Sequence, residues 1–118
     1  ANVTLEDIDF AEVHDCFTIA ELLTYEAMGL APKGQGARAL EDGTVYRGGA
    51  LPVNLSGGLK AKGHPVGATG VSMHALAFRQ LTNQAGDLQV PGAELGLLFN
   101  MGGSAVANYV SVLEARKV

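Results

Sequence analysis

Residues 63–70 read Gly-His-Pro-Val-Gly-Ala-Thr-Gly, and the interpretation of the whole sequence depends on this stretch. It places His64 directly before Pro65, inside a glycine-rich turn. Proline is favoured in the first turn of a helix because its missing N–H is not needed there. The octet therefore predicts a histidine at the start of a helix, where free N–H groups favour negative charge. Taken alone, it is also explained by a glycine-rich turn with an incidental histidine.

The composition indicates one globular domain. The chain has 118 residues, of which 47% are hydrophobic and 17% charged, which separates it from disordered sequences. A net charge of −4 without a basic stripe argues against nucleic-acid binding. Cys16 is the single cysteine, which rules out an internal disulfide and favours a reducing compartment. No apolar run is long enough to span a membrane and no signal-peptide pattern is present, so we expect a cytoplasmic location.

A helix is expected to follow the octet and to end near Gly86. One apolar face is predicted for it, formed by Val71, His74, Ala75, Phe78 and Leu81. His74 is therefore interpreted as a core or interface residue. A continuous apolar run at 95–99 predicts a buried strand, and residues 108–113 have strong β propensity. These two strands are expected to form a hairpin.

The N-terminal half predicts a strand at 8–13 and a helix at 18–28. Thr18 and Glu21 have the spacing of a capping box, and Gly29 is a typical stop signal. Residues 31–62 lack a long periodic pattern and are expected to form a functional loop, with a short extended piece at 51–54. The order is β-α-long loop-α-β-β, an α/β fold with about three strands covered by two helices. Such a small sheet leaves a face or an edge open, so we expect a larger fold or a docking partner.

Four residues that can carry chemistry lie at the ends of these elements. His14 and Cys16 follow the first strand, His64 precedes a helix, and Asn100 ends the strand at 95–99. A lone cysteine is most often an inert buried residue. Beside a histidine and at a helix start, its thiolate is stabilised. The spacing does not fit a zinc site. A Cys-His-Asn hydrolase would require Cys16, His64 and Asn100 to be adjacent in space.

Together these motifs resemble the C-terminal portion of a thiolase, most closely the sterol-carrier-protein-2 type. That subgroup has His-Asp-Cys-Phe where other thiolases have Asn-Glu-Ala-Phe, and residues 14–17 read His-Asp-Cys-Phe. Residues 63–70 match the family's Gly-His-Pro motif and its Gly-Ala-x-Gly tail. Residues 54–58, Asn-Leu-Ser-Gly-Gly, are similar to the family's Asn-Pro-Ser-Gly-Gly segment, and residues 21–27 are similar to the subgroup's helix.

The chain departs from the family pattern in two ways. Most thiolases have a Cys-x-Gly motif where residues 100–102 read Asn-Met-Gly. The subgroup resemblance implies that Cys16 takes over the acid/base role of that missing cysteine. A whole thiolase is also several times longer. We therefore expect residues 1–118 to be a partial C-terminal domain, without the N-terminal domain, the CoA loop domain and the first strand and helix of this domain.

The resemblance implies Claisen-type acyl transfer between a 3-ketoacyl-CoA and CoA, with CoA as co-substrate and no permanently bound cofactor or metal. It implies that His64 is the base for a nucleophilic thiol and that His14 helps to bind the enolate oxygen. The second oxyanion site is expected at Asn100, Gly102 and Gly103. Substrate-binding positions are expected in the matching motifs, at Phe17, Asn54, Ser56 and Gly57. The expected partners are acyl-CoA, the remaining thiolase domains or a partner subunit, and further copies in a dimer or tetramer.

Two other functions stay open. One is an aldolase or lyase subunit of sterol side-chain degradation that works with a small partner protein. Relatives of that kind tend to lose the histidine of the Gly-His-Pro motif, whereas His64 is present. The other is a non-catalytic fragment that provides a dimerisation or acyl-binding surface. In the thiolase interpretation the chain is expected to be inactive alone, because its one cysteine already has another role.

Overall fold

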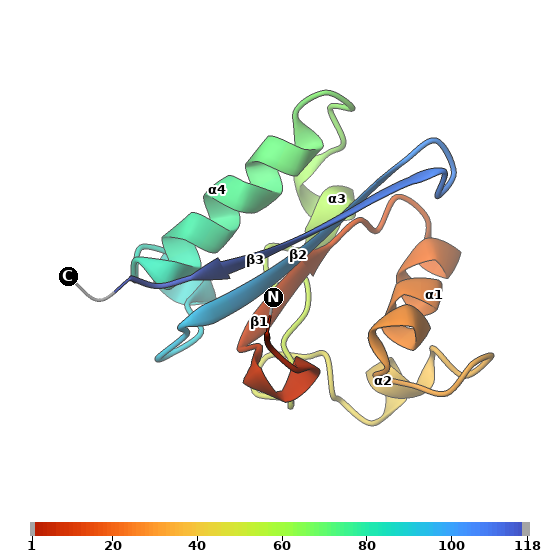
Figure 1. The fold of residues 1–118 in the computed structure, drawn as a ribbon, viewed down its shortest axis with the longest axis horizontal. Coiled ribbons are helices and arrows are strands. Elements are labelled where there is room, and N and C mark those ends of the chain that lie inside the picture. Colours follow the sequence, from red (N-terminus) through yellow and green to blue (C-terminus); the bar gives the residue numbers. More distant parts are fainter. Residues whose placement is uncertain (1, 117–118) are drawn as a thin grey trace.

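A computed structural model describes residues 2–116 (Figure 1). The helices and strands are β1 (Phe10–Val13), α1 (Thr18–Met28), α2 (Arg38–Glu41), α3 (Gly58–Lys62), α4 (Thr69–Leu81), β2 (Leu95–Gly102) and β3 (Ala107–Glu114), with short 3-10 helices at Leu5–Asp7 and Gly86–Leu88. The predicted α/β class and strand–helix order are confirmed. Residue 1 and residues 117–118 of the predicted domain lie outside the described residues.

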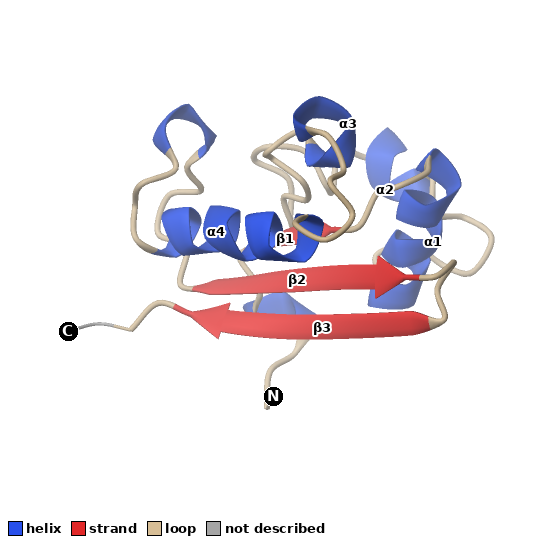
Figure 2. Ribbon diagram, turned by 90° about the horizontal axis from the view of Figure 1, so that it is seen from above, coloured by secondary structure: helices blue, strands red, loops and turns tan. Residues whose placement is uncertain are grey.

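The sheet is mixed, with the strand order β1-β2-β3. Strands β1 and β2 are parallel, whereas β2 and β3 form the predicted antiparallel hairpin. The predicted extended piece at 51–54 makes a parallel bridge from Val53 to Ala11 on the outer side of β1. Figure 2 shows α4 along one face of the sheet and α1 beside the end to which β2 points. The carboxyl ends of β1 and β2 therefore lie near the start of α1.

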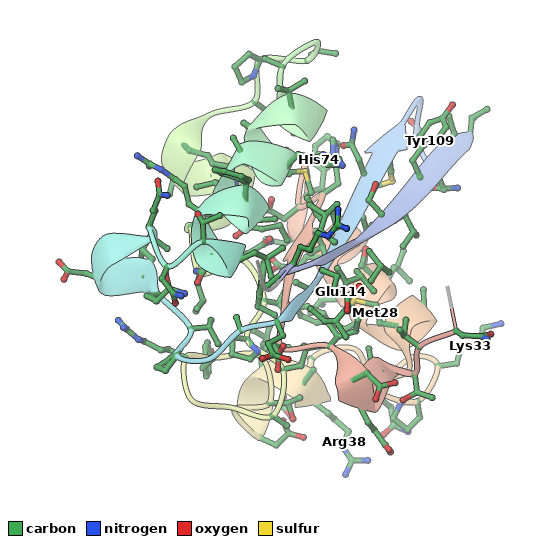
Figure 3. All side chains as sticks on the ribbon, turned by 60° about the vertical axis from the view of Figure 1, so that its left-hand side comes forward. Met28, Lys33, Arg38, His74, Tyr109 and Glu114 are labelled. Carbon is green, nitrogen blue, oxygen red and sulfur yellow. The ribbon has the colours of Figure 1, made fainter. Side chains whose placement is uncertain are left out.

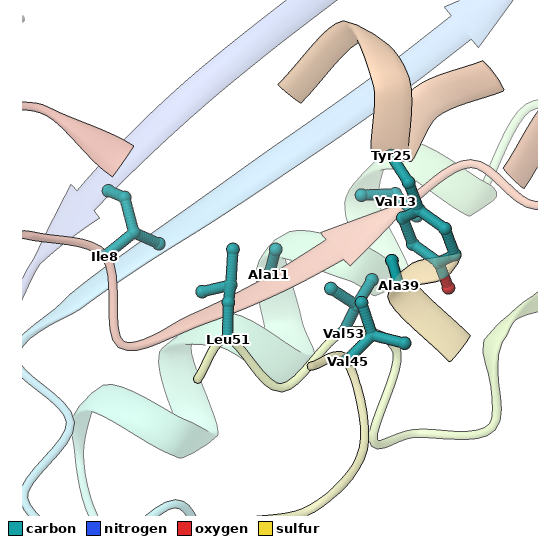
Figure 4. Close-up of a cluster of buried hydrophobic side chains, with 8 residues drawn as sticks. All are labelled: Ile8, Ala11, Val13, Tyr25, Ala39, Val45, Leu51 and Val53. Atoms are coloured by element: carbon teal, nitrogen blue, oxygen red, sulfur yellow. The ribbon is translucent and has the colours of Figure 1, made fainter. Parts of the chain in front are cut away.

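The apolar core has two parts. The larger part joins β1 and α1 to the segment between α1 and α3, and Figure 4 shows its members: Ile8, Ala11, Val13, Tyr25, Ala39, Val45, Leu51 and Val53. The smaller part lies between the sheet and α4, where Phe10 and Leu98 pack against Met73 and Ala77. The long segment after α1 is thus a packed structural element rather than an open loop.

Several details of the sequence prediction were wrong. The segment 31–62 contains α2 and α3, which are too short to show a periodic pattern; Ala39 of α2 packs in the larger core and Leu59 of α3 donates its N–H to Asp15. The N-cap residue of α1 is Phe17 rather than Thr18, so the predicted capping box does not form, and the Glu21 carboxylate accepts the Tyr25 hydroxyl proton at 2.6 Å. Helix α4 ends at Leu81 rather than near Gly86, because Asn83 turns the chain with a φ of 57°.

The buried face of α4 also differs from the predicted one. The residues that face the core are Thr69, Met73, Ala77 and Gln80. Val71 and Phe78, placed on the apolar face by the sequence, are 72% and 59% exposed. His74 is exposed too; its Nε2 lies 3.1 Å from the Ser111 hydroxyl of β3 and its Nδ1 lies 2.7 Å from the Gly70 carbonyl. This helix therefore carries apolar residues on two sides, and the helical period of the sequence does not indicate which side is buried.

The sheet face away from α4 is incompletely covered within the described residues. Leu97 and Phe99 of β2 pair with Val112 and Val110 of β3, and Val110 is 62% exposed. Together with α1 and the N-terminal 3-10 helix (Leu5–Asp7), these residues line a depression of about 390 Å³. The expectation that a face of the sheet is left open agrees with this arrangement.

Candidate active site

A second cleft, larger than the depression beside the sheet, lies where the carboxyl ends of β1 and β2 meet α1 and the turn before α4. It has a volume of about 940 Å³. Its walls include the predicted site residues His14, Cys16, Phe17, His64, Asn100, Gly102 and Gly103. Apolar side chains of α1 and of the β2–β3 hairpin form most of the rest; Tyr109 extends from β3 in Figure 3. The topology thus brings together predicted site residues that lie up to 89 positions apart, from His14 to Gly103.

His14 is fixed at the floor of this cleft. It extends β1 by one residue, because its N–H donates to the Phe99 carbonyl at 2.9 Å, and it is only 5% exposed. Its Nδ1 lies 2.7 Å from Oδ1 of Asn100. An amide oxygen can only accept, so His14 Nδ1 carries the proton. In the neutral ring, Nε2 is therefore left with a lone pair.

Asn100 lies within β2, paired with Tyr109, rather than at the end of the strand as predicted. The strand runs three residues beyond the predicted end at Phe99, because the hairpin pairs without interruption to Gly102. The amide nitrogen of Asn100 faces the start of α4, where a Cβ on Gly70 would approach it to 2.8 Å. A glycine at position 70 therefore lets the helix approach the side chain that orients His14.

His64 lies against His14 at the mouth of the cleft. The two ring centroids are 4.9 Å apart and the ring planes are nearly perpendicular, at 86°. His64 Nδ1 is 2.6 Å from the Thr69 hydroxyl, which itself donates to the Pro65 carbonyl at 3.1 Å. A hydroxyl has one proton to donate, so it accepts from His64 Nδ1–H. His64 Nε2 is then unprotonated and free to take a proton.

Thr69 is a site residue that the sequence analysis missed. It is 2% exposed and belongs to the first turn of α4. The available signal was a hydroxyl five residues after the histidine, at the point where the helix begins. At that spacing the Thr69 side chain reaches back to contact the His64 ring.

Cys16 is a free, half-buried thiol that lines the cleft immediately before α1. Phe17, its neighbour, is 70% exposed at the same wall. Gly102 is the last residue of β2, and Gly103 begins the turn with a φ of 58°. The cleft thus combines a thiol, two imidazoles, an amide and a glycine turn.

Three predicted substrate-binding residues do not line this cleft. Asn54 Oδ1 accepts the Val13 N–H at 2.8 Å, and Ser56 Oγ donates to Glu12 at 2.7 Å. Gly57 is the cap of α3, with a φ of 85°. In the described chain these residues make internal contacts, and their binding role stays a prediction.

Within residues 2–116, no group of three or more His, Cys, Asp or Glu side chains is arranged to hold a metal ion. The same part of the chain has no helix that is both long enough and apolar enough to cross a membrane.

Comparisons with known proteins agree with this architecture. Residues 1–115 match the family described as "Thiolase C-terminal domain-like". An acetyl-CoA acetyltransferase of Methanothermobacter thermautotrophicus is 52% identical over 104 residues, which are 88% of this chain and 27% of that protein. Human sterol carrier protein 2 is 51% identical over 107 residues, 90% of this chain and 20% of that protein.

A solved structure named "Ltp2-ChsH2(DUF35) aldolase" superimposes with a TM-score of 0.72 and 27% identity, over 98% of this chain and 29% of that one. The chain therefore spans less than a third of each of these relatives. Because the match to the C-terminal domain of the family extends over nearly the whole sequence, the chain belongs to the thiolase family.

Proposed function

We propose that this chain is the catalytic C-terminal segment of a thiolase-type acyl-CoA acyltransferase. The reaction would be cleavage of a 3-ketoacyl-CoA by CoA, or the reverse Claisen condensation, with CoA as co-substrate. The observation that carries this proposal is the pair of histidine rings, 4.9 Å apart, in a cleft that Cys16 also lines. Acyl transfer to a thiol needs a base, an oxyanion site and a second proton carrier, and the cleft holds groups suited to each.

His64 is the base in this proposal. Its Nδ1–H donates to the Thr69 hydroxyl, so in the neutral ring Nε2 carries a lone pair. A thiol attacks as the thiolate, so a base beside it raises its reactivity. An imidazole is suited to this task because its ordinary pKa lies close to neutral pH. The nucleophilic thiol itself would come from a part of the protein outside residues 1–118.

The negative oxygen that develops on the thioester needs donors around it. We assign this role to His14 and His64 on one side and to the backbone around Gly102 and Gly103 on the other. Because His14 Nδ1–H donates to Asn100, its Nε2 becomes a donor only when the ring is protonated. Asn100 is then a positioning group that stabilises the imidazolium form.

Cys16 is assigned the second proton transfer, at the α-carbon and at the leaving thiolate. A thiol exchanges protons near neutral pH when its surroundings tune it. It is the single sulfhydryl of the chain, so the isolated segment would lack the nucleophile and be inactive. The expected dimer or tetramer, the substrate contacts of Phe17, Asn54, Ser56 and Gly57, and a cytoplasmic location complete the proposal.

A chimera tests the function directly. Residues 1–115 would replace the aligned segment of the Methanothermobacter acetyl-CoA acetyltransferase, which supplies the rest of the fold. We expect CoA-dependent cleavage of acetoacetyl-CoA that is lost on His64→Ala. A chimera that folds and assembles like its parent but has no activity, or whose activity survives His64→Ala, would contradict the proposal.

The resemblance to the aldolase structure supports a second candidate, an aldolase half-site that acts with a partner protein. Retro-aldol cleavage needs a base but no acyl-enzyme and no CoA thiol. The two functions are separated by incubating the chimera with a 3-hydroxyacyl-CoA in the absence of CoA. Release of an aldehyde or ketone from this substrate favours the aldolase, whereas cleavage of a 3-ketoacyl-CoA that depends strictly on added CoA favours the acyltransferase.

A further inference from the structure

We propose that Asp15 is a positioning residue that sets the contact between the rings of His14 and His64. It does so by fastening the turn after β1 to the start of α3. The catalytic consequence of this inference rests on the proposed function, whereas its geometric part does not. Asp15 is not part of the cleft lining, although the residues on either side of it, His14 and Cys16, both are.

The Asp15 carboxylate is buried inside the protein and directed away from the cleft. It is 3% exposed, and its Oδ1 accepts the Leu59 N–H at 2.8 Å. Leu59 is the second residue of α3, so this bond satisfies one of the free N–H groups at the helix start. A charged acceptor makes such a hydrogen bond stronger than a neutral one.

Gly58 shows how close this contact is. A Cβ built at Gly58 would lie 2.1 Å from Oδ2 of Asp15 and 2.7 Å from its Cγ. Those distances exclude any side chain unless the carboxylate moves away. Gly58 also has a φ of 64°, which side chains other than glycine rarely adopt. The carboxylate and the glycine therefore fit as a pair.

The far end of α3 is attached to the same strand. Lys62, its last residue, forms an ion pair with Glu12 at 3.1 Å and donates to Ser56 Oγ at 2.8 Å. Glu12 belongs to β1 and is 5% exposed. Both ends of this five-residue helix are thus tied to β1 or to the turn that follows it.

His64 is two residues beyond the end of α3, so the placement of α3 determines where its ring lies. His14 is one residue before Asp15. The bond from Asp15 to Leu59 therefore links the two histidine-bearing segments by a short path through buried groups. A misplacement of about 1 Å in a reacting group can cost about a hundredfold in rate, so loosening this link should affect turnover.

The inference is tested in the chimera with Asp15→Ala and Gly58→Ala. The first removes the carboxylate, and the second displaces it with a Cβ. Each is expected to lower kcat at least about tenfold with little change in KM. The double variant should be no worse than the poorer single variant, because both remove one contact. Asp15→Asn keeps an oxygen acceptor for Leu59 and should recover most of kcat.

Val45→Ala is the matched control. Val45 is a buried core residue that does not line the cleft. It should lower stability while leaving kcat unchanged. Equal losses of kcat in Val45→Ala and Asp15→Ala, or additive losses in the double variant, would overturn the proposal by showing a purely structural role.

A crystal structure of the Asp15→Ala chimera tests the geometry whether or not the chimera is active. We expect the centroids of His14 and His64 to move apart from 4.9 Å. If the contact is retained, the inference fails even where the proposed function holds. If the contact is lost and the parent chimera with Asp15 intact also lacks thiolase activity, the inference holds and the proposed function fails.

Discussion

The Thr69 hydroxyl accepts the Nδ1 proton of His64 at 2.6 Å and thereby decides which ring nitrogen is free. Replacing Thr69 by valine keeps the shape of the side chain but removes the acceptor. We expect kcat of the chimera to fall roughly tenfold, the effect of losing about one hydrogen bond. Steady-state kinetics measure this loss. Thr69→Ser retains the hydroxyl and is the control; equal losses for serine and valine would refute the role of the hydroxyl.

Cys16→Ser separates the two half-reactions. Serine is similar in size but its hydroxyl does not ionise near neutral pH, so it cannot shuttle the proton. Acylation of the nucleophile should be nearly normal, while the Claisen or retro-Claisen step should slow by about a hundredfold, a typical contribution of acid–base catalysis. Burst-phase trapping of the acyl-enzyme and steady-state turnover give the two rates. If both half-reactions survive unchanged, the assignment of Cys16 is wrong.

The isolated chain is expected to be catalytically inactive. His64 has no thiol to activate once Cys16 acts in proton transfer. The check is an assay of CoA-dependent cleavage of acetoacetyl-CoA with the purified 118-residue chain. Measurable turnover that disappears on Cys16→Ala would instead make Cys16 the nucleophile.

Gly96→Ala is expected to destabilise the fold by about 1–3 kcal/mol, the usual cost of overpacking a core. A Cβ at Gly96 would lie 2.4 Å from Cζ of Phe10, its partner across the sheet. Gly102→Ala lies in the same strand and meets nothing within 4 Å, so it should be close to neutral. Urea unfolding of both variants measures the difference, and equal stabilities would contradict the packing argument.

Stability at acid pH should depend on Glu26. Hydrogen bonds from the backbone of Gly34 and then of Gly36 hold the pKa of this carboxyl below its ordinary value. A depressed pKa in the folded state stabilises the fold above the unfolded-state pKa, and this contribution is lost as the pH falls through the folded-state pKa. Thermal melts from neutral pH to about pH 3 should show a shallower decline for Glu26→Gln than for the parent. Parallel curves would exclude the contribution.

The parts of the fold that were predicted correctly depend on local signals. Helix α1 ends at Gly29, whose φ of 84° provides the expected left-handed stop. The hairpin was recognisable because two strongly β-forming runs follow each other. His64 precedes α4 as predicted, but α4 begins only at Thr69, so Pro65 lies in the turn before the helix rather than in its first turn.

The parts that were missed depend on contacts between distant residues. Helix α3 is held at its start by Asp15, which is far away in the sequence and accepts the Leu59 N–H. The buried face of α4 could not be chosen from a pattern with apolar residues on two sides. Thr69 was missed because a threonine at a helix start has no distinctive pattern in the sequence; its role becomes visible only from the position of the His64 ring in space.

The segment between α1 and α3 has a practical consequence. It packs behind β1, and none of the cleft residues lies between Ala27 and His64. Tyr46 and Arg47 are exposed on this side, and Gly48 has no atom within 4 Å of its Cβ position. A fluorescent reporter attached at Gly48 would therefore lie outside the cleft. The segment between α1 and α3 thus offers a position for an optical probe.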